Sequence, residues 1–502
     1  SPASRMNAPR RARFPRRAPA ATLGAIVVVA AGMGDGMEAG TRSGSVPPDP
    51  LGGMDLARYG AALRAGRTSA EATTRAFLAR IAAAEPRIGC FLHVAQDAAI
   101  ASARAMDALL RAGTDLGPLM GVPVAVKDLF FVDGMPTRAG SKVDVSDLVG
   151  PEAGMVRRLR RLGAVILGKA RQSEFAFAAN LRHDPPWNPW DAGTKRMAGT
   201  SSGGSAVAMA SRFAAFTLGS DAGGSVRQPA ALNGVVGYKA TVGFLPTEGA
   251  LALSSTFDSI GTFHPCVADA ALVLSALRDE PPIAPRAPRG LRLGLDRRFA
   301  LDTAAPGVGA RFAAALDALQ REGVELVPMS TPGVEEIPRM AGQLVPAEMV
   351  AFYGADRLRA NRDLIDPVAW ERIVPGLEAS AHDYLRLVAL HRDLVRRGVA
   401  AMEGLDGWVM PTVPEFPQPV ADFPSVERVH WWNGRVNDAT RLANYLGQCG
   451  VSLPLPADEP GALPAGLQLV CAPGADRALL ATGMAIEQVI GPGDAPDLSG
   501  FC

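Results

Sequence analysis

Apolar and polar positions along this chain follow two different periods. Between residues 54 and 112 the apolar positions recur every third or fourth residue, as in Thr-Arg-Ala-Phe-Leu-Ala-Arg-Ile at 74–81, which predicts amphipathic helices. Thr68, with Glu71 three positions later, has the spacing of a capping box and predicts the start of one helix. The first part of the folded chain is therefore expected to be helical.

Short continuous apolar runs predict buried strands farther along the chain. The run at 122–126 ends directly before Lys127, and the run at 164–168 follows a basic helical segment at 155–162. Beyond a proline-dense loop we expect a strand at 291–295 and helices at 307–322 and 378–403. Strands that alternate with helices in this way indicate the α/β class.

The first 50 residues have a different composition. Residues 1–17 hold six arginines and no acid, residues 18–33 are mostly apolar, and glycine, proline and serine follow. These are the basic and apolar regions of a signal peptide, and the apolar run is too short to span a membrane comfortably. We expect residues 1–50 to form a signal-like or disordered extension before one domain at 51–495. A cytoplasmic location is expected, with export as the alternative.

Composition narrows the function classes. The chain has 502 residues, 48% of them hydrophobic, and a formal net charge of +1, so it has ample apolar material for a core and no basic excess for nucleic acid or an anionic membrane. Its five cysteines form no CxxC pair and its six histidines form no HExxH motif. We therefore expect no disulfide framework, no metal site and no cofactor.

All five lysines lie between residues 127 and 239, and every other basic residue is an arginine. Lysine can give up its proton at accessible pH, whereas arginine cannot. Lys127 ends an apolar strand, so burial is expected to lower its pKa towards neutrality and make it a usable general base. The alternative is a lysine that reaches the surface or pairs with Asp128.

Two segments rich in glycine and serine, at 199–205 and 219–229, follow later in the chain. Their exposed backbone N–H groups could cradle an anion, either a phosphate or an oxyanion. Neither segment matches the nucleotide-binding P-loop pattern, and apolar flanks distinguish them from linkers. Ser201 formally fits G-x-S-x-G, but the segment before it is polar rather than a strand, which weakens the nucleophile-elbow interpretation. A serine activated by a distant lysine is the remaining hypothesis.

Longer motifs carry a family resemblance. Besides the two glycine-rich segments, the chain contains Asn-Pro-Trp-Asp from 188, Gly-Val-Val-Gly-Tyr-Lys from 234, Gly-Lys-Ala-Arg-Gln-Ser-Glu-Phe-Ala from 168, Met-Pro-Thr from 410 and Leu-Pro-Ala-Gly-Leu-Gln-Leu-Val from 463. Over roughly residues 54–490 the chain resembles the amidase signature family. The resemblance implies a central mixed, twisted β-sheet covered by helices on both faces. It also implies a catalytic core at 120–265 and a variable, substrate-side region at 290–450, after the helical part at 54–112.

The resemblance also implies a Ser–cis-Ser–Lys triad. Ser225 would be the nucleophile that forms an acyl-enzyme, and Ser201, after a cis peptide bond, would pass protons between Ser225 and Lys127. The oxyanion would be held by the backbone N–H groups of Ala222, Gly223, Gly224 and Ser225. Asp221 and Arg227 would support the loop. The chain departs from the family pattern at Thr200, where glycine is usual, and at Ala240, where proline is usual.

We compare three functions with these motifs. The first is an amidase that hydrolyses a small-molecule carboxylic amide to the acid and ammonia or amine, with a homodimer as a compatible assembly. The second is the glutaminase (A) subunit of a glutamyl-tRNA(Gln) amidotransferase, which residues 241–249 disfavour because they lack the run Tyr-Gly-Arg-Val-Ser-Arg-Tyr-Gly. A non-enzymatic scaffold would be expected to lack a triad member, and none is lacking.

Substrate-binding residues are not assigned by the sequence. The aromatic residues of the variable regions hint at an apolar pocket, although such residues more often belong to the core. They are Phe130, Phe131, Trp187, Trp431 and Trp432.

Overall fold

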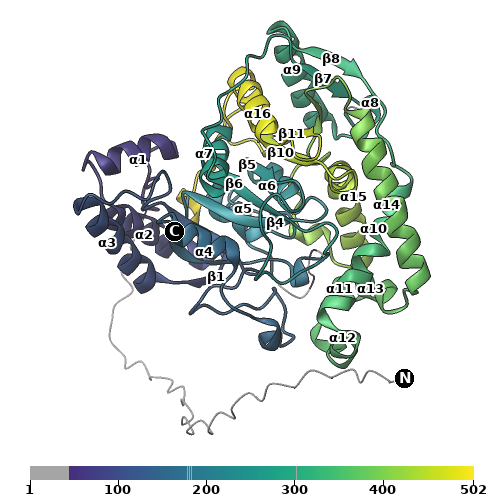
Figure 1. Ribbon diagram of the computed structural model, residues 1–502, viewed down its shortest axis with the longest axis horizontal. Helices are drawn as coiled ribbons and strands as arrows, with labels where there is room; N and C mark the ends of the chain where they lie inside the picture. Colours follow the sequence, from purple (N-terminus) through teal and green to yellow (C-terminus); the bar gives the residue numbers. More distant parts are fainter. Residues whose placement is uncertain (1–44, 178, 180, 182–183, 301) are drawn as a thin grey trace, which may run out of the picture. The chain divides into compact units, whose positions relative to one another are not determined.

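A mixed β-sheet of eleven strands organises the part of the chain that the computed structural model describes, which is residues 45–502 except 178, 180, 182–183 and 301 (Figure 1). The expected extension at 1–50 therefore lies almost wholly outside the described residues. The strand order across the sheet is β1-β3-β2-β4-β6-β5-β10-β11-β9-β7-β8. The strands are β1 (Phe91–Val94), β2 (Pro123–Lys127), β3 (Val165–Ala170), β4 (Phe216–Asp221), β5 (Val236–Lys239), β6 (Ser259–His264), β7 (Arg292–Leu295), β8 (Glu325–Pro328), β9 (Gly407–Pro411), β10 (Cys449–Pro454) and β11 (Gly466–Cys471).

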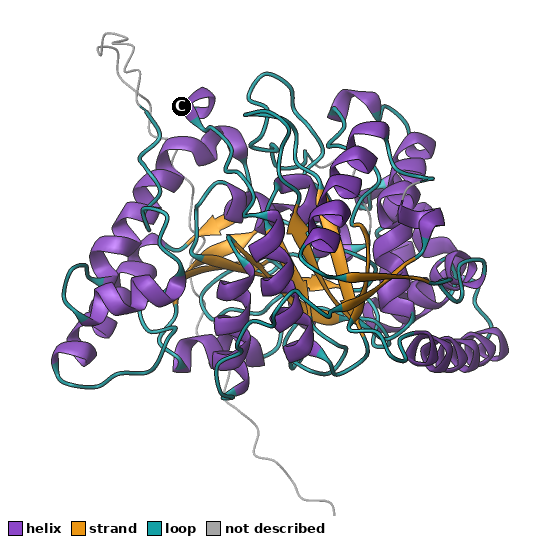
Figure 2. Cartoon of the chain, turned by 90° about the horizontal axis from the view of Figure 1, so that it is seen from above, coloured by secondary structure: helices purple, strands orange, loops and turns teal. Residues whose placement is uncertain are grey.

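Parallel and antiparallel pairs are both present in this sheet. Strand β2 runs parallel to β3 and β4, and β7 runs parallel to β8 and β9, whereas the ladder from β4 through β6, β5, β10 and β11 to β9 is antiparallel. Figure 2 shows helices on both sides of the strands. The expected α/β class and mixed sheet are confirmed.

Helices account for nearly half of the remaining described residues. They are α1 (Leu56–Arg64), α2 (Ala70–Ile88), α3 (Gln96–Arg111), α4 (Gly154–Arg161), α5 (Gly203–Ala210), α6 (Arg227–Asn233), α7 (Val267–Arg278), α8 (Arg297–Ala300), α9 (Pro306–Arg321), α10 (Glu336–Ala341), α11 (Leu344–Tyr353), α12 (Ala355–Ala360), α13 (Pro367–Leu377), α14 (Ala381–Ala401), α15 (Val426–Tyr445) and α16 (Asp476–Ile490). The predicted strands and helices all occur, within a few residues of their predicted ends. Within the described ranges, no helix is long and apolar enough to cross a membrane.

The helical start of the chain differs from prediction in two places. Strand β1 interrupts it and pairs with β3 at the edge of the sheet, because four residues of a largely helical pattern are too few to show a separate period. The prediction of a capping box at Thr68 is wrong. Ser69 is the N-cap of α2, where its hydroxyl accepts a hydrogen bond from the N–H of Ala72 at 3.0 Å, and Glu71 forms an ion pair with Arg75 at 2.9 Å instead of closing the box.

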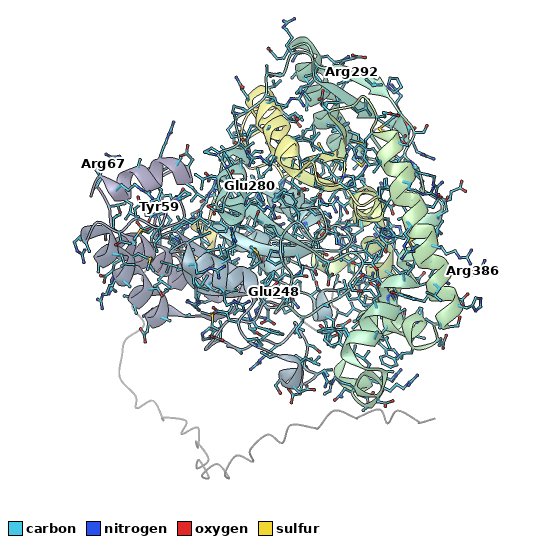
Figure 3. All side chains as sticks on the ribbon, in the orientation of Figure 1. Tyr59, Arg67, Glu248, Glu280, Arg292 and Arg386 are labelled. Carbon is cyan, nitrogen blue, oxygen red and sulfur yellow. The ribbon has the colours of Figure 1, made fainter. Side chains whose placement is uncertain are left out.

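The two glycine-rich segments lie next to the buried centre of the sheet. Strand β2 is buried along its whole length, and the hydroxyl of Tyr59 on α1 donates to the carbonyl of Gly121, just before β2, at 2.9 Å (Figure 3). Helix α5 packs on β4, and α6 packs on β5 and β10. Helix α5 begins inside the first glycine-rich segment, and α6 begins inside the second.

Candidate active site

Lys127 lies at the carboxyl end of β2, with its side chain fully buried. Its Nζ is 2.7 Å from Oγ of Ser201 and 2.9 Å from Oγ of Ser220. Burial lowers the pKa of Lys127 from its usual 10.5 to about 7, and the negative charges of Asp258 and Asp221 only partly oppose this shift. An amine with this pKa is neutral in a large fraction of molecules near pH 7, so it can accept a proton.

Asp128, the alternative partner of Lys127, faces a different lysine. Its carboxylate lies 3.3 Å from Nζ of Lys169, and both side chains are buried. Lys169 also donates to the carbonyl of Pro136 at 3.1 Å and to the hydroxyl of Thr137 at 2.9 Å. The interpretation of Lys127 as an ion-pair partner of Asp128 is therefore wrong, and Lys127 keeps two hydroxyl groups as its neighbours.

Ser201 belongs to the first glycine-rich segment, which precedes α5. The peptide bond between Thr200 and Ser201 is cis, and the N–H of Thr200 donates to Oε1 of Gln228 at 2.9 Å. A Cβ at Gly199 would lie 2.7 Å from Cα of Pro229, so only glycine lets this segment pass so close to α6.

Ser225 lies in the loop between β4 and α6. Together with Ser201 it lines two cavities, and the carbonyl of Ser225 accepts a hydrogen bond from the N–H of Ser202 at 3.3 Å. Among the described residues the hydroxyl of Ser225 forms no hydrogen bond. This hydroxyl is therefore free to meet a ligand.

A buried ion pair supports the Ser225 loop. Arg227 and Asp221 lie 3.0 Å apart with no solvent exposure, and Arg227 also donates to Oδ1 of Asn444 at 2.7 Å and Oε1 of Gln468 at 2.6 Å. Although burial raises the pKa of Asp221, the charge and hydrogen bonds of Arg227 hold it well below the usual range. These contacts are those of a structural support, as the resemblance implies for both residues.

The four N–H groups expected to hold an oxyanion are not equivalent. The N–H of Gly224 donates to Oδ1 of Asp221 at 2.8 Å, whereas those of Ala222, Gly223 and Ser225 have no acceptor within the described chain. Three of the four groups are thus available to a negative oxygen.

The two glycines of this loop are needed for different reasons. A Cβ at Gly224, whose φ is +122°, would lie 2.0 Å from Oγ1 of Thr440 on α15, whereas a Cβ at Gly223 would meet no atom within 4 Å. Packing against α15 therefore requires glycine at 224, and the space beside 223 is open.

Two cavities meet at Ser201 and Ser225. The larger, about 300 Å³, has a mostly apolar wall that includes Leu129, Phe130, Leu251, Leu253 and Ile260, with Asp258 and Ser220 as polar members. The smaller, about 50 Å³, is lined from α13 and α15 by Arg372, Asn437, Arg441 and Tyr445. A ligand whose carbonyl lies at Ser225 has room to extend on either side.

Of the five aromatic residues named from the sequence, Phe130 lines a cavity. Phe131 and Trp432 are buried in the core, Trp187 is partly buried, and Trp431 is 47% exposed.

The polar cavity residues that sequence reasoning missed include Ser220, Asp258, Arg372 and Arg441. Ser220 lies inside a quoted motif, and the close pairing of β4 with β2 could have indicated it. The two arginines are more than 140 residues beyond Ser225 in the chain and have no local signal.

The remaining lysines have contacts that explain them without chemistry. Lys239 donates to the carbonyls of Ala240 and Gln448 at 2.9 and 2.8 Å, Lys195 pairs with Asp184 at 2.5 Å, and Lys142 is exposed. Across the described residues, no cluster of three or more His, Cys, Asp or Glu side chains could hold a metal ion.

Comparisons with known proteins agree with this geometry. Residues 72–480 match the Amidase family. The 2-amino-5-chloromuconic acid deaminase of Comamonas testosteroni is 34% identical over 89% of this chain and 99% of its own length, and the A subunit of the glutamyl-tRNA(Gln) amidotransferase of Salinispora arenicola has the same identity and coverage. A crystal structure of an amidase superposes with a TM-score of 0.79 at 32% identity, covering 87% of this chain and all of its own. This chain therefore belongs to the amidase signature family and has its fold.

Proposed function

We propose that this protein is an amidase that hydrolyses a linear carboxylic amide of small size to the carboxylic acid and ammonia or an amine, with Ser225 as the nucleophile. The observation that carries the proposal is the buried contact of Lys127 with Ser201, at 2.7 Å, beside a Ser225 hydroxyl that faces two cavities. Lys127 supplies a base that is largely neutral near pH 7, and the hydroxyl of Ser201 can relay a proton. Both lie in the same site as the Ser225 hydroxyl, the proposed nucleophile.

The proposed proton path uses the Lys127–Ser201 contact and the shared position of Ser201 and Ser225 on the cavity walls. Neutral Lys127 accepts the proton of Ser201, Ser201 accepts the proton of Ser225, and Oγ of Ser225 adds to the amide carbonyl carbon. The N–H groups of Ala222, Gly223 and Ser225 stabilise the resulting oxyanion. When the C–N bond breaks, the proton on Lys127 returns through Ser201 to the leaving nitrogen. Water then adds to the acyl-enzyme, gives its proton to the same relay, and releases the acid and Ser225.

The glutaminase subunit of an amidotransferase is the second candidate. Several relatives that bear this name show 33–34% identity to this chain over most of its length. The first-named relative is a deaminase of an amino-substituted chlorinated acid, which favours an enzyme that works on a small molecule without partner subunits. Residues 241–249 also lack the sequence run typical of the glutaminase subunits.

An ammonia-release assay on the purified chain tests the proposal. The substrates are a panel of aliphatic, aromatic and amino-acid amides together with glutamine, with no partner protein added. We expect release from at least one simple amide, its abolition in Lys127→Ala and Ser225→Ala, and full activity in the control Lys142→Ala, which removes an exposed lysine. Full activity in Lys127→Ala or Ser225→Ala contradicts the mechanism, and release from glutamine alone favours the second candidate.

A further inference from the structure

Two arginines line the small cavity beside Ser225 without a carboxylate partner. Arg372 comes from α13 and Arg441 from α15, two helices that pack against each other (Figure 1). Both side chains line the cavity together with Ser201, Gly223 and Ser225. Within the described residues neither arginine forms an ion pair, whereas Arg435, which also lies on α15, pairs with Glu415 at 3.0 Å.

Within the described residues no ion pair compensates the positive charge of this cavity. Arg372 donates to the carbonyl of Phe177 and lies 4.2 Å from the centre of its ring, and both of these groups are uncharged. Burial and, to a smaller extent, the nearby charge of Arg441 lower the pKa of Arg372 from 12.5 to about 10. Asp438, one turn before Arg441, is exposed; its negative charge attracts that of Arg441, but the two side chains form no ion pair. Two like charges in a partly buried space repel each other, and an anion placed with them relieves that repulsion.

The other groups of the cavity do not favour a cation. Among the described residues no acidic side chain lines it. Asn437, one turn before Arg441 on α15, is neutral and donates to the carbonyl of Asn433 at 2.7 Å. A guanidinium group presents parallel N–H donors that match the two oxygens of a carboxylate. Carboxylate is therefore the ligand chemistry that this wall fits.

We propose that the substrate is an amide that also carries a carboxylate, and that Arg372 and Arg441 bind this carboxylate while the amide carbonyl lies at Ser225. The inference rests on the proposed amidase function and specifies its substrate class. The apolar cavity of about 300 Å³ on the other side of Ser225 takes the remainder of the molecule.

The first experiment compares matched amides with and without a carboxylate. Monoamides of malonic, succinic, glutaric and adipic acid place the carboxylate on the acyl side, and N-acyl amino acids place it on the amine side. Each is paired with its neutral methyl ester. We expect kcat/KM for at least one anionic amide to exceed that of its ester by about 30-fold or more, and the preferred series shows which side of the scissile bond faces the arginines.

Variants at the two arginines then locate the effect. Arg441→Met and Arg372→Met are expected to lower kcat/KM for the anionic amide by about 10- to 100-fold, mainly through a higher KM, and to change the ester by less than about threefold. Arg441→Lys restores part of the loss because it keeps the charge. Arg428→Met is the matched control, since Arg428 is an exposed arginine of the same helix, and it leaves both substrates unaffected.

A binding measurement separates this inference from the proposed function. Succinate and glutarate are added to the Ser225→Ala protein with and without Arg441→Met, and the melting temperature is recorded. Stabilisation that depends on Arg441 supports the inference even where no amide is hydrolysed, a result that contradicts the proposed function alone. Equal hydrolysis of anionic and neutral amides, or equal losses for both in the arginine variants, overturns the inference and leaves the amidase function standing. Absence of both hydrolysis and stabilisation overturns both.

Discussion

Replacing Lys127 with methionine is expected to destroy activity and at the same time stabilise the fold. Methionine fills nearly the same space as the lysine stem but cannot accept a proton. Loss of a positioned general base lowers rates by about 10²- to 10⁴-fold. Because Lys127 is fully buried and faces only two hydroxyl groups within 3 Å, its ammonium form has little compensation in the folded protein.

The gain in stability follows from the pKa of Lys127. The shift from 10.5 to about 7 corresponds to about 5 kcal/mol of unfavourable free energy when the lysine is charged in both the folded and unfolded states, since each pH unit is about 1.4 kcal/mol. Removing the amine also leaves Ser201 and Ser220 without a partner, at about 1 kcal/mol each. The net increase in the free energy of unfolding is expected to be about 2–3 kcal/mol near pH 7.

The pH dependence of this gain is the decisive measurement. Below pH 7 Lys127 is charged in both states and the full penalty applies. Between pH 7 and 10.5 Lys127 holds its proton in the unfolded chain but not in the folded protein. Folding must then release this proton, which becomes easier as the pH rises, so the penalty on the wild-type protein shrinks across this window. Urea midpoints of wild type, Lys127→Met and the exposed control Lys142→Met at pH 6, 7, 8, 9 and 10 should show an advantage for Lys127→Met that shrinks with pH. An advantage that stays constant or grows with pH would refute the reasoning.

Four further substitutions test the loop around Ser225. Asp221→Asn leaves its buried arginine partner without a counter-charge and is expected to lower the free energy of unfolding by about 3–5 kcal/mol in urea titrations. Gly224→Ala places a Cβ 2.0 Å from Oγ1 of Thr440 and should lower both the melting temperature and kcat. Gly223→Ala places a Cβ that meets no atom within 4 Å and should lower kcat/KM without changing the melting temperature. Equal losses of melting temperature in the two variants would contradict the packing argument. Ser220→Ala removes one 2.9 Å hydrogen bond to Lys127 and is expected to lower kcat by about two- to tenfold in the ammonia-release assay, with an unchanged rate as the contrary result.

The sequence predicts the catalytic centre better than its surroundings. A buried strand that ends in Lys127 is visible from local hydrophobicity, and the glycine-rich segments carry enough motif to place Ser201 and Ser225. The strand at 91–94 and the N-cap at Ser69 depend on choices between neighbouring residues that local patterns do not resolve. The cavity walls depend on tertiary packing, because Arg372 and Arg441 reach Ser225 through helices whose own sequences look like ordinary amphipathic helices.

Helix α15 joins two tasks that are often separate in enzymes. One side of it carries Asn437 and Arg441, which line the small cavity, and also Thr440 and Asn444, which contact the loop of Ser225 and its arginine support. In the proposed mechanism, the same few turns of α15 therefore contribute both to substrate choice and to the position of Ser225. Grafting this helix from a relative to obtain a new specificity would disturb the nucleophile as well, so redesign is better confined to single side chains at 437 and 441. For the same reason a shortened chain that keeps all three residues of the proposed triad but ends before residue 426 would lack a working nucleophile loop.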